Sequence, residues 1–155
     1  MENSIIISEA TFEKARKKIK ENSGKIIVFS SDDDELNRKI LEKEKINVLL
    51  LNLVGRKDFQ KQRNSGFNSV LAKLAKKNKI QIGINLDEII NSHGKEKAEI
   101  LARIKQNIKL CNKNRVEMKL ISPSGIKRDI YDLKSLGLVL GMPTWMTSKV
   151  VAGSD

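Results

Sequence analysis

The sequence predicts an α/β protein made of repeated βα units around a parallel, barrel-like sheet. Short runs rich in Ile, Leu and Val alternate with amphipathic stretches along the whole chain, as in proteins built from such units. The run NVLLLNLV (47–54) is apolar on both faces, which is typical of a central parallel strand. In IQIGINL (80–86), large apolar residues alternate with Gln, Gly and Asn. A small polar side that faces inward suits a barrel better than an open doubly wound sheet.

The first half of the chain is predicted to hold three strands and two helices. The strands span residues 4–7, 25–30 and 47–54, and the helices span 9–22 and 31–45. The buried side chains predicted for the helices are Phe12, Ala15 and Ile19 in the first and Leu36, Ile40 and Leu41 in the second. A hydroxyl or carboxylate in SDDDE (31–35) can cap the second helix.

The second half continues the alternation, which brings the total to about five to six recognisable strands. Strands are predicted at 80–86 and 116–122, a long helix at 95–113, and a short helix at 143–151 with Pro143 near its start. Another helix begins near Ser65. Its apolar face carries Phe67, Val70, Leu71, Leu74 and Ala75, and its opposite face carries Lys73, Lys76 and Lys77.

The long helix and the stretch after it differ in their apolar pattern. The long helix is predicted to turn Leu101, Ile104, Ile108 and Cys111 inward. The stretch 129–142 begins with a capping Asp129 and is apolar over much of its circumference. A buried helix and a helix-to-strand transition near Gly137 are therefore both open at this point.

Length and charge predict one domain over residues 1–155 with an acidic partner. A net charge of +11 and a pI of about 9.8 are typical of nucleic-acid-binding proteins, although a solvated lysine-rich surface would give the same charge. The N-terminal MENSIII does not resemble a signal peptide, and no apolar run approaches the roughly 20 residues of a membrane span. We expect a cytoplasmic protein that makes no membrane contact.

Few catalytic groups are available in this chain. The single cysteine, Cys111, excludes an internal disulfide and is expected to be an ordinary buried thiol. The single histidine, His93, leaves no His pair for a metal site or for Ser-His-Asp catalysis. No dinucleotide or P-loop motif occurs, so no cofactor or metal is expected on the chain.

An acidic run follows the second strand. Asp32, Asp33, Asp34 and Glu35 lie where parallel sheets usually form their active sites. These carboxylates could hold Mg²⁺, but capping of the next helix accounts for them without a ligand. Both interpretations stay open at this point.

Basic residues gather after the most apolar strand. Arg56, Lys57, Lys61 and Arg63 follow it, and the lysine face of the next helix adjoins them. Arginine can hold a phosphate through two hydrogen bonds, whereas lysine acts as a mobile point charge. An aromatic content of 4% argues against a stacking platform for single-stranded bases. Recognition of RNA through its phosphates and shape is therefore the expectation.

Several of these segments resemble the family of ribonuclease P protein component 3, the archaeal relative of the eukaryotic p30-type subunit. The resemblance runs from about residue 48 to 150, and residues 25–47 match by pattern alone. Its motifs are GRKD (55–58), SGFNSVLAKLAKKN (65–78), IGINL (82–86) and RDIYDLKSLGLVLGM (128–142).

The resemblance implies a TIM-barrel-like fold of the polymerase-and-histidinol-phosphatase type and a role as a ribonucleoprotein subunit. In that enzyme the RNA subunit uses Mg²⁺ to remove the 5′ leader from precursor tRNA, so catalysis is expected in the RNA. The implied partners are ribonuclease P RNA, a small ferredoxin-like protein subunit and, indirectly, precursor tRNA.

Site residues follow from the motif positions. The RNA-binding residues that the resemblance implies are Arg56, Lys57, Lys73, Lys77 and Arg128. The basic pattern itself adds Lys61, Arg63 and Lys76, for which RNA contact and a solvated surface both stay open. Asp58 and Asp129 match acidic positions and are expected to fix a loop and a cap.

The chain departs from the family pattern in two ways. Asp87 stands where an arginine is usual, which puts an RNA contact at that point in doubt. The family also carries further βα units before the matched region. We therefore expect an N-terminally shortened chain. Either its barrel is incomplete and partly open, or another chain covers the exposed edges, and the partner subunit is the preferred candidate.

Three functional hypotheses follow, in order of preference. The first is an RNA-binding subunit of ribonuclease P. The alternative is a small metal-dependent phosphoester hydrolase of barrel type, which rests on fold analogy and the acidic run. The third is a general nucleic-acid chaperone without a fixed RNA partner.

Overall fold

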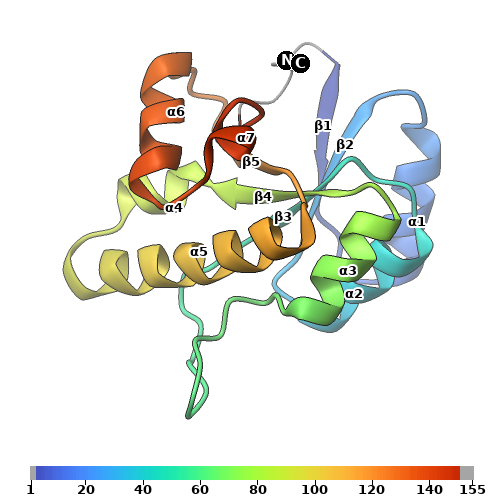
Figure 1. Cartoon of the computed structure of the whole chain (residues 1–155). Helices are drawn as coiled ribbons and strands as arrows, with labels where there is room; N and C mark the ends of the chain where they lie inside the picture. The colour runs from blue at the N-terminus through green and yellow to red at the C-terminus, as the bar shows by residue number, and fades with distance from the viewer. Residues whose placement is uncertain (1–2, 151–155) are drawn as a thin grey trace.

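The computed structural model describes residues 3–150, and these form one parallel sheet with helices between the strands (Figure 1). The five strands lie in chain order from β1 to β5, and each neighbouring pair is parallel. They are β1 Ser4–Ile7, β2 Ile26–Ser30, β3 Val48–Leu51, β4 Gln81–Asn85 and β5 Met118–Ile121. The helices are α1 Phe12–Glu21, α2 Asp34–Lys43, α3 Ser69–Lys77, α4 Leu86–Asn91, α5 Gly94–Asn114, α6 Ile130–Val139 and α7 Thr144–Thr147. The predicted α/β class and repeated βα units are confirmed.

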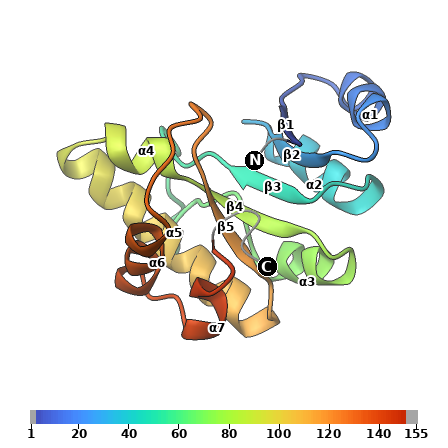
Figure 2. The same cartoon turned by 90° about the horizontal axis from the view of Figure 1, so that it is seen from above.

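The main core lies between one face of the sheet and the helices. Strand residues alternate, so that Phe29, Leu49 and Ile82 join the main core while Val28 and Val48 form a second apolar cluster on the other face. Burial of this size is the largest favourable contribution to folding. Viewed from above, the strands cross the centre with α1 and α2 beside β1 and β2 and with α5 beside β4 and β5 (Figure 2).

The second face of the sheet carries Val28, Val48, Leu50 and Ile121. Because a pocket opens on it, we call it the pocket face. The small polar side predicted for residues 80–86 lies on it, because Ile82 and Ile84 belong to the main core. A Cβ on Gly83 would approach Val48, Leu50 and Ile121 to 3.0–3.2 Å, which explains a glycine at this position.

The barrel is not closed by the described residues. The sheet ends at β1 on one side and at β5 on the other. Beyond β5, the N–H of Leu120 donates to the carbonyl of Val150 at 2.7 Å. The fold is therefore TIM-barrel-like, with consecutive βα units in an open arc.

Polar side chains start several helices. Thr11, Asp33, Asn68 and Asn85 accept hydrogen bonds from backbone N–H groups in the first turns of α1 to α4. The capping role predicted for the acidic run is thus confirmed at Asp33. Asp129 occupies the first position before α6, but its side chain makes no capping hydrogen bond, so that prediction is wrong.

Two helix predictions and one burial prediction need correction. Helix α4 was not predicted, because LDEIIN follows β4 directly without a turn residue. Helix α3 begins at Ser69 rather than near Ser65, since Asn68 caps it. This start leaves Phe67 buried ahead of the helix and Val70 60% exposed, so the inward position predicted for Val70 is wrong.

The stretch 129–142 forms a helix, but the helix is not buried. In α6 Gly137 packs against Met142 and Thr147, whereas Tyr131, Leu138 and Val139 are exposed. A transition to a strand does not occur there. The short helix predicted at 143–151 is α7, and Val151 lies outside the described residues.

Helix α5 buries Ile104, Ile108 and Cys111 as predicted, while Leu101 is only partly buried at the edge of the core. Burial raises the pKa of the Cys111 thiol, as expected of an unreactive core residue. Among residues 3–150, no helix has the length and apolar composition needed to cross a membrane.

Candidate nucleic-acid interface

The loop between β3 and α3 follows the carboxyl end of the central strand and extends past α5 in Figure 1. A buried arginine on α5 holds the start of this loop. Arg103, whose side chain is 3% exposed, donates to the carbonyls of Leu53 and Arg56 at 3.0 and 2.7 Å. Both bonds join segments almost fifty residues apart in the sequence, so the loop is fixed to the long helix rather than free.

Asp58, on the loop itself, connects three other residues. Its carboxylate accepts hydrogen bonds from the Asn64 N–H at 2.9 Å, from Arg63 at 3.0 Å and from Arg103 at 3.2 Å. The Asn64 N–H and the two guanidinium groups lower the pKa of Asp58 against a smaller effect of burial. Asp58 thus fixes the loop, as expected for it.

Glu88 on α4 holds the first turn of the same loop. Its two carboxylate oxygens accept the N–H groups of Leu53 at 2.8 Å and Val54 at 3.0 Å. Burial raises the pKa of Glu88, and the two N–H groups oppose that shift. The carboxylate is therefore a structural clamp.

The side chain of Arg56, the first predicted RNA contact, already binds other groups of the protein. Its guanidinium binds both oxygens of Asp34 at 2.9 and 3.0 Å, and its Nε donates to the Asn52 carbonyl at 2.7 Å. The side chain is 9% exposed. Arg56 therefore positions the loop, and an RNA contact by Arg56 stays a prediction.

Each aspartate in the acidic run has a structural partner. Asp32 accepts from Asn52, Asp33 caps α2, and Asp34 pairs with Arg56. Within residues 3–150, no group of three or more His, Cys, Asp or Glu side chains is arranged to hold a metal ion. The geometry thus gives the magnesium interpretation no support.

The other cations predicted in this region lie on the loop after β3 and on α3. On the loop, Lys57 and Lys61 are exposed and pair with no acid among the described residues, whereas Arg63 pairs with Asp58. On α3, Lys73 and Lys77 are exposed. Lys76 donates to the carbonyl of Arg115 at 3.0 Å, near the amino ends of β4 and β5. The structure thus separates the lysine face predicted for α3 into free and engaged side chains.

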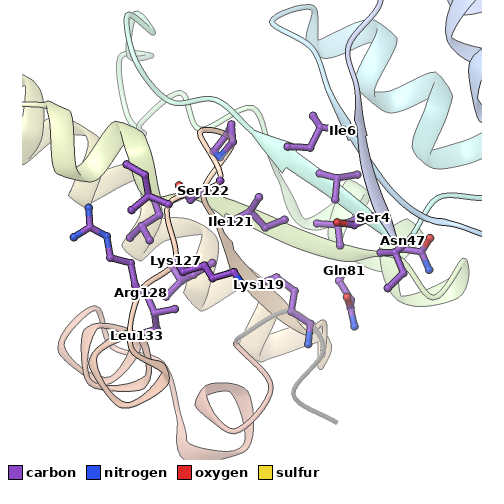
Figure 3. Close-up of a pocket in the computed structure, with 18 residues that line it drawn as sticks. Ser4, Ile6, Asn47, Gln81, Lys119, Ile121, Ser122, Lys127, Arg128 and Leu133 are labelled. Carbon is purple, nitrogen blue, oxygen red and sulfur yellow. The ribbon is translucent and has the colours of Figure 1, made fainter. Parts of the chain in front are cut away.

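Arg128 lies at the rim of a pocket of about 630 Å³ on the pocket face. In Figure 3, Arg128, Lys127 and Leu133 gather on one side of this pocket, and Ser4, Asn47 and Gln81 lie on the other. Arg128 is exposed. Arg128 lies at the carboxyl end of the sheet, the same end from which the loop after β3 starts. Its role in RNA binding stays a prediction.

Asp87, the departure from the family pattern, has its own partners. It accepts hydrogen bonds from Ser122 and from the Ser124 N–H, the latter at 2.8 Å. Burial alone would raise the pKa of Asp87, but the two serines and the charge of Arg128 together lower it. Asp87 thus ties α4 to the loop after β5.

Sequence reasoning missed Arg103 and Glu88. Arg103 lies on the same helical face as Ile100, Ile104 and Asn107, all of which are buried. The sequence did contain a signal for Arg103, namely a charged residue on the apolar face of a predicted helix. Such a group must find partners when it is buried. Glu88 gave no comparable signal, since α4 itself was not predicted.

Known proteins are similar to this chain over most of its length. The model of the family described as RNase P subunit p30 matches residues 4–153. Ribonuclease P protein component 3 of Methanococcus maripaludis strain C7 is 28% identical over 135 residues, which are 87% of this chain and 54% of the relative. The corresponding protein of Methanosarcina acetivorans is 31% identical over 114 residues, 74% of this chain and 44% of the relative.

A solved structure shares the fold. One chain of a cryo-EM structure of archaeal ribonuclease P with mature tRNA superposes with a TM-score of 0.77 at 26% identity, over 92% of this chain and 62% of that chain. This chain spans about half the length of the relatives that it matches. Because the family model covers nearly every residue, the chain belongs to the RNase P subunit p30 family.

Proposed function

We propose that this chain acts as a protein subunit of ribonuclease P and binds the RNA that removes the 5′ leader from precursor tRNA. The observation that carries the proposal is the family match over residues 4–153. The fold likeness to a chain of an archaeal ribonuclease P particle supports it. The net charge of +11 fits a partner made of phosphates.

In this proposal the exposed lysines contact the RNA backbone. Lys57 and Lys61 lie on a loop that Arg103 and Glu88 fix, so ordering the loop costs little entropy on binding. Lys73 and Lys77 extend from α3, which ends near the amino ends of the strands, whereas Arg128 extends from the loop after β5 at the carboxyl end of the sheet. Arg56 and Arg63 hold the loop in shape through Asp34 and Asp58.

The chemistry is assigned to the RNA. Mg²⁺ would be bound by the RNA subunit, and this chain would hold no cofactor. A small ferredoxin-like protein subunit is the proposed neighbour that covers the free edges of the sheet, and precursor tRNA is contacted indirectly. The cytoplasm is the proposed location.

Reconstitution tests the proposal. Cleavage of precursor tRNA would be measured with ribonuclease P RNA and the other protein subunits, with and without this chain, across Mg²⁺ concentrations. The chain should increase the rate and lower the Mg²⁺ requirement, and Lys57→Ala/Lys61→Ala/Lys77→Ala should reduce that effect. Lys17→Gln/Lys39→Gln, which removes exposed charges on α1 and α2, is the control. An identical rate with and without the chain at every concentration would reject the proposal.

The hydrolase alternative is not proposed, because no observation favours it. The carboxylates on which it rests cap a helix or pair with Asn52 and Arg56.

A further inference from the structure

A second pocket lies at the opposite end of the sheet from the loop after β3. It encloses about 720 Å³ beside the amino ends of β4 and β5. Its polar and aromatic lining residues are Lys76, Lys79, Gln81, Arg115, Glu117 and Trp145. The end of α3, the end of α5 and helix α7 together form its walls.

Positive charge dominates this pocket. Lys79 and Arg115 form no ion pair with any of residues 3–150, and Lys76 donates only to a backbone carbonyl. The one acid, Glu117, accepts from Gln81 at 2.8 Å and lies 3.9 Å from Lys149. Three cations facing one partnered carboxylate make the pocket attractive to an anion.

The backbone shows that two of these cations occupy unusual positions. Lys79 and Arg115 both have φ of +57°, and in residues 3–150 no other non-glycine residue has a positive φ. Each follows a helix that ends in the same way, with Ile80 N–H donating to Ala75 O and Val116 N–H donating to Cys111 O, both at 2.9 Å. Glycine is the usual residue at this left-handed position, because a Cβ is disfavoured there.

Compensation of the helix dipole does not explain why Lys79 and Arg115, rather than glycines, occupy the two left-handed positions. Basic residues favour helix C-termini, but the last turns of α3 and α5 already carry Lys77 and Lys113. Both left-handed positions instead place a cation in the same pocket.

An aromatic wall completes the pocket. The Arg115 guanidinium lies over the Trp145 ring, 5.2 Å from its centroid, and the indole N–H donates to Asn112 at 3.0 Å. The indole is thus held in place, and the stacked guanidinium retains N–H groups for a phosphate.

We propose that this pocket binds an unpaired nucleotide of RNA, with its phosphates at Lys79 and Arg115 and its base against the exposed part of Trp145 that Arg115 does not cover. The choice of RNA as the ligand rests on the proposed function. The size of the pocket suits one nucleotide rather than a duplex. A single aromatic residue is sufficient here, because one base stacks at one position.

The single tryptophan of the chain provides the readout. A short single-stranded oligoadenylate would be titrated while Trp145 fluorescence is recorded, and the affinity would be measured separately with a labelled oligonucleotide. Wild type should show a saturable fluorescence change. Lys79→Gly/Arg115→Gly should lose it and bind about 25-fold more weakly near ~0.1 M salt, because two released counterions at roughly 0.7 each change the salt slope by about 1.4.

Glycine is chosen so that folding survives. It relieves the left-handed strain at both positions, so the unfolding midpoint of the double variant should stay near that of wild type. Lys17→Gln/Lys39→Gln removes the same charge elsewhere and should keep the fluorescence change. Equal affinity in the two double variants, or a loss of the fluorescence change in both, would overturn the proposal.

The reconstitution assay separates this inference from the proposed function. If wild type stimulates precursor tRNA cleavage but its Trp145 fluorescence does not respond to oligoadenylate, the pocket proposal fails alone. If the fluorescence responds as described but the chain does not alter cleavage, the ribonuclease P proposal fails and the pocket stands.

Discussion

Arg103 shows how one buried residue determines the shape of a surface loop. Its guanidinium satisfies two carbonyls and one carboxylate, all from the segment after β3. A buried arginine is tolerated only when its donors are paired, and the carbonyls depend on it equally. The position of the exposed Lys57 on the loop therefore depends on Arg103, a residue of helix α5.

Replacing Arg103 tests this dependence. Arg103→Met should lower the free energy of unfolding by about 3 kcal/mol, because it leaves the Leu53 and Arg56 carbonyls without their side-chain donor and removes one of the partners of Asp58. Denaturant unfolding measures the change. Lys105→Met, on the exposed side of the same helix, should stay within about 0.5 kcal/mol of wild type. Equal effects of the two substitutions would contradict the role given to Arg103.

Asp58 should make the protein less stable in acid. Its pKa is lowered in the folded state from 3.8, so the unfolded chain binds the proton more readily and stability falls as pH drops below about 5. Glu88 acts in the opposite direction, because its raised pKa favours protonation of the folded form. Asp58→Asn should be less stable at neutral pH and lose stability less steeply in acid.

Unfolding midpoints measured from pH 7 to pH 3 check this expectation. Glu42→Gln, an exposed carboxylate on α2 outside the network, is the control. If the unfolding midpoint of Asp58→Asn fell with decreasing pH as steeply as that of wild type, Asp58 would not contribute to the loss of stability in acid.

At the level of elements, the loop after β3 and helix α3 form one unit. Gly66 has φ of +69°, and a Cβ there would lie 2.5 Å from the Arg56 guanidinium. The guanidinium cannot move away freely, since Asp34, Asn52 and Asn64 all bind it. The glycine before α3 thus permits the ion pair that anchors the loop.

Two glycines in this loop allow a matched test. Gly55 has φ of +71° with open space around its Cβ position, so Gly55→Ala should cost only the backbone strain of about 1–2 kcal/mol. Gly66→Ala should cost more, and trypsin should cut the loop faster. In an Arg56→Ala background the two substitutions should cost the same. If Gly66→Ala still lowered the free energy of unfolding more than Gly55→Ala in the Arg56→Ala background, a clash with Arg56 would not be the cause.

Element predictions succeeded where the pattern was local. Strands β1 to β5 each consist of a short run that is apolar or alternates apolar and polar residues, and such a run can be recognised without knowing its neighbours. Helix α4 was missed because its six residues extend β4 without a break. Helix α6 looked buried because its residues are apolar, although Tyr131, Leu138 and Val139 are exposed.

At the level of the whole molecule, the sheet has two unlike faces. Helices cover one face, while the other forms a pocket of about 630 Å³ at whose edge Ile6 is 41% exposed. Relatives about twice as long match this chain over about half of their length. A partner that completes the arc would meet Ile6 and the free edge of β1.

Substitution of Ile6 tests whether this face is used in the particle. Ile6→Asp should lower the free energy of unfolding by about 1 kcal/mol, because the side chain is already partly exposed. It should reduce incorporation of the chain into reconstituted particles, measured by co-purification. Ile90→Asp, at a residue that is 39% exposed on α4 and outside the pocket, is the matched control. Equal incorporation of both variants would exclude the pocket face as an interface.

The sequence by itself determined the strands, the βα alternation, the excess positive charge and the family, because each is a local pattern or a sum over residues. Only the tertiary structure decided which cations are free. Arg56 pairs with Asp34, 22 residues away, and Asp58 pairs with Arg103, 45 residues away, whereas Lys57 between them stays exposed. Spacing along the chain contains no information about such partners. They are fixed only when the sheet brings the ends of β2 and β3 and helix α5 together.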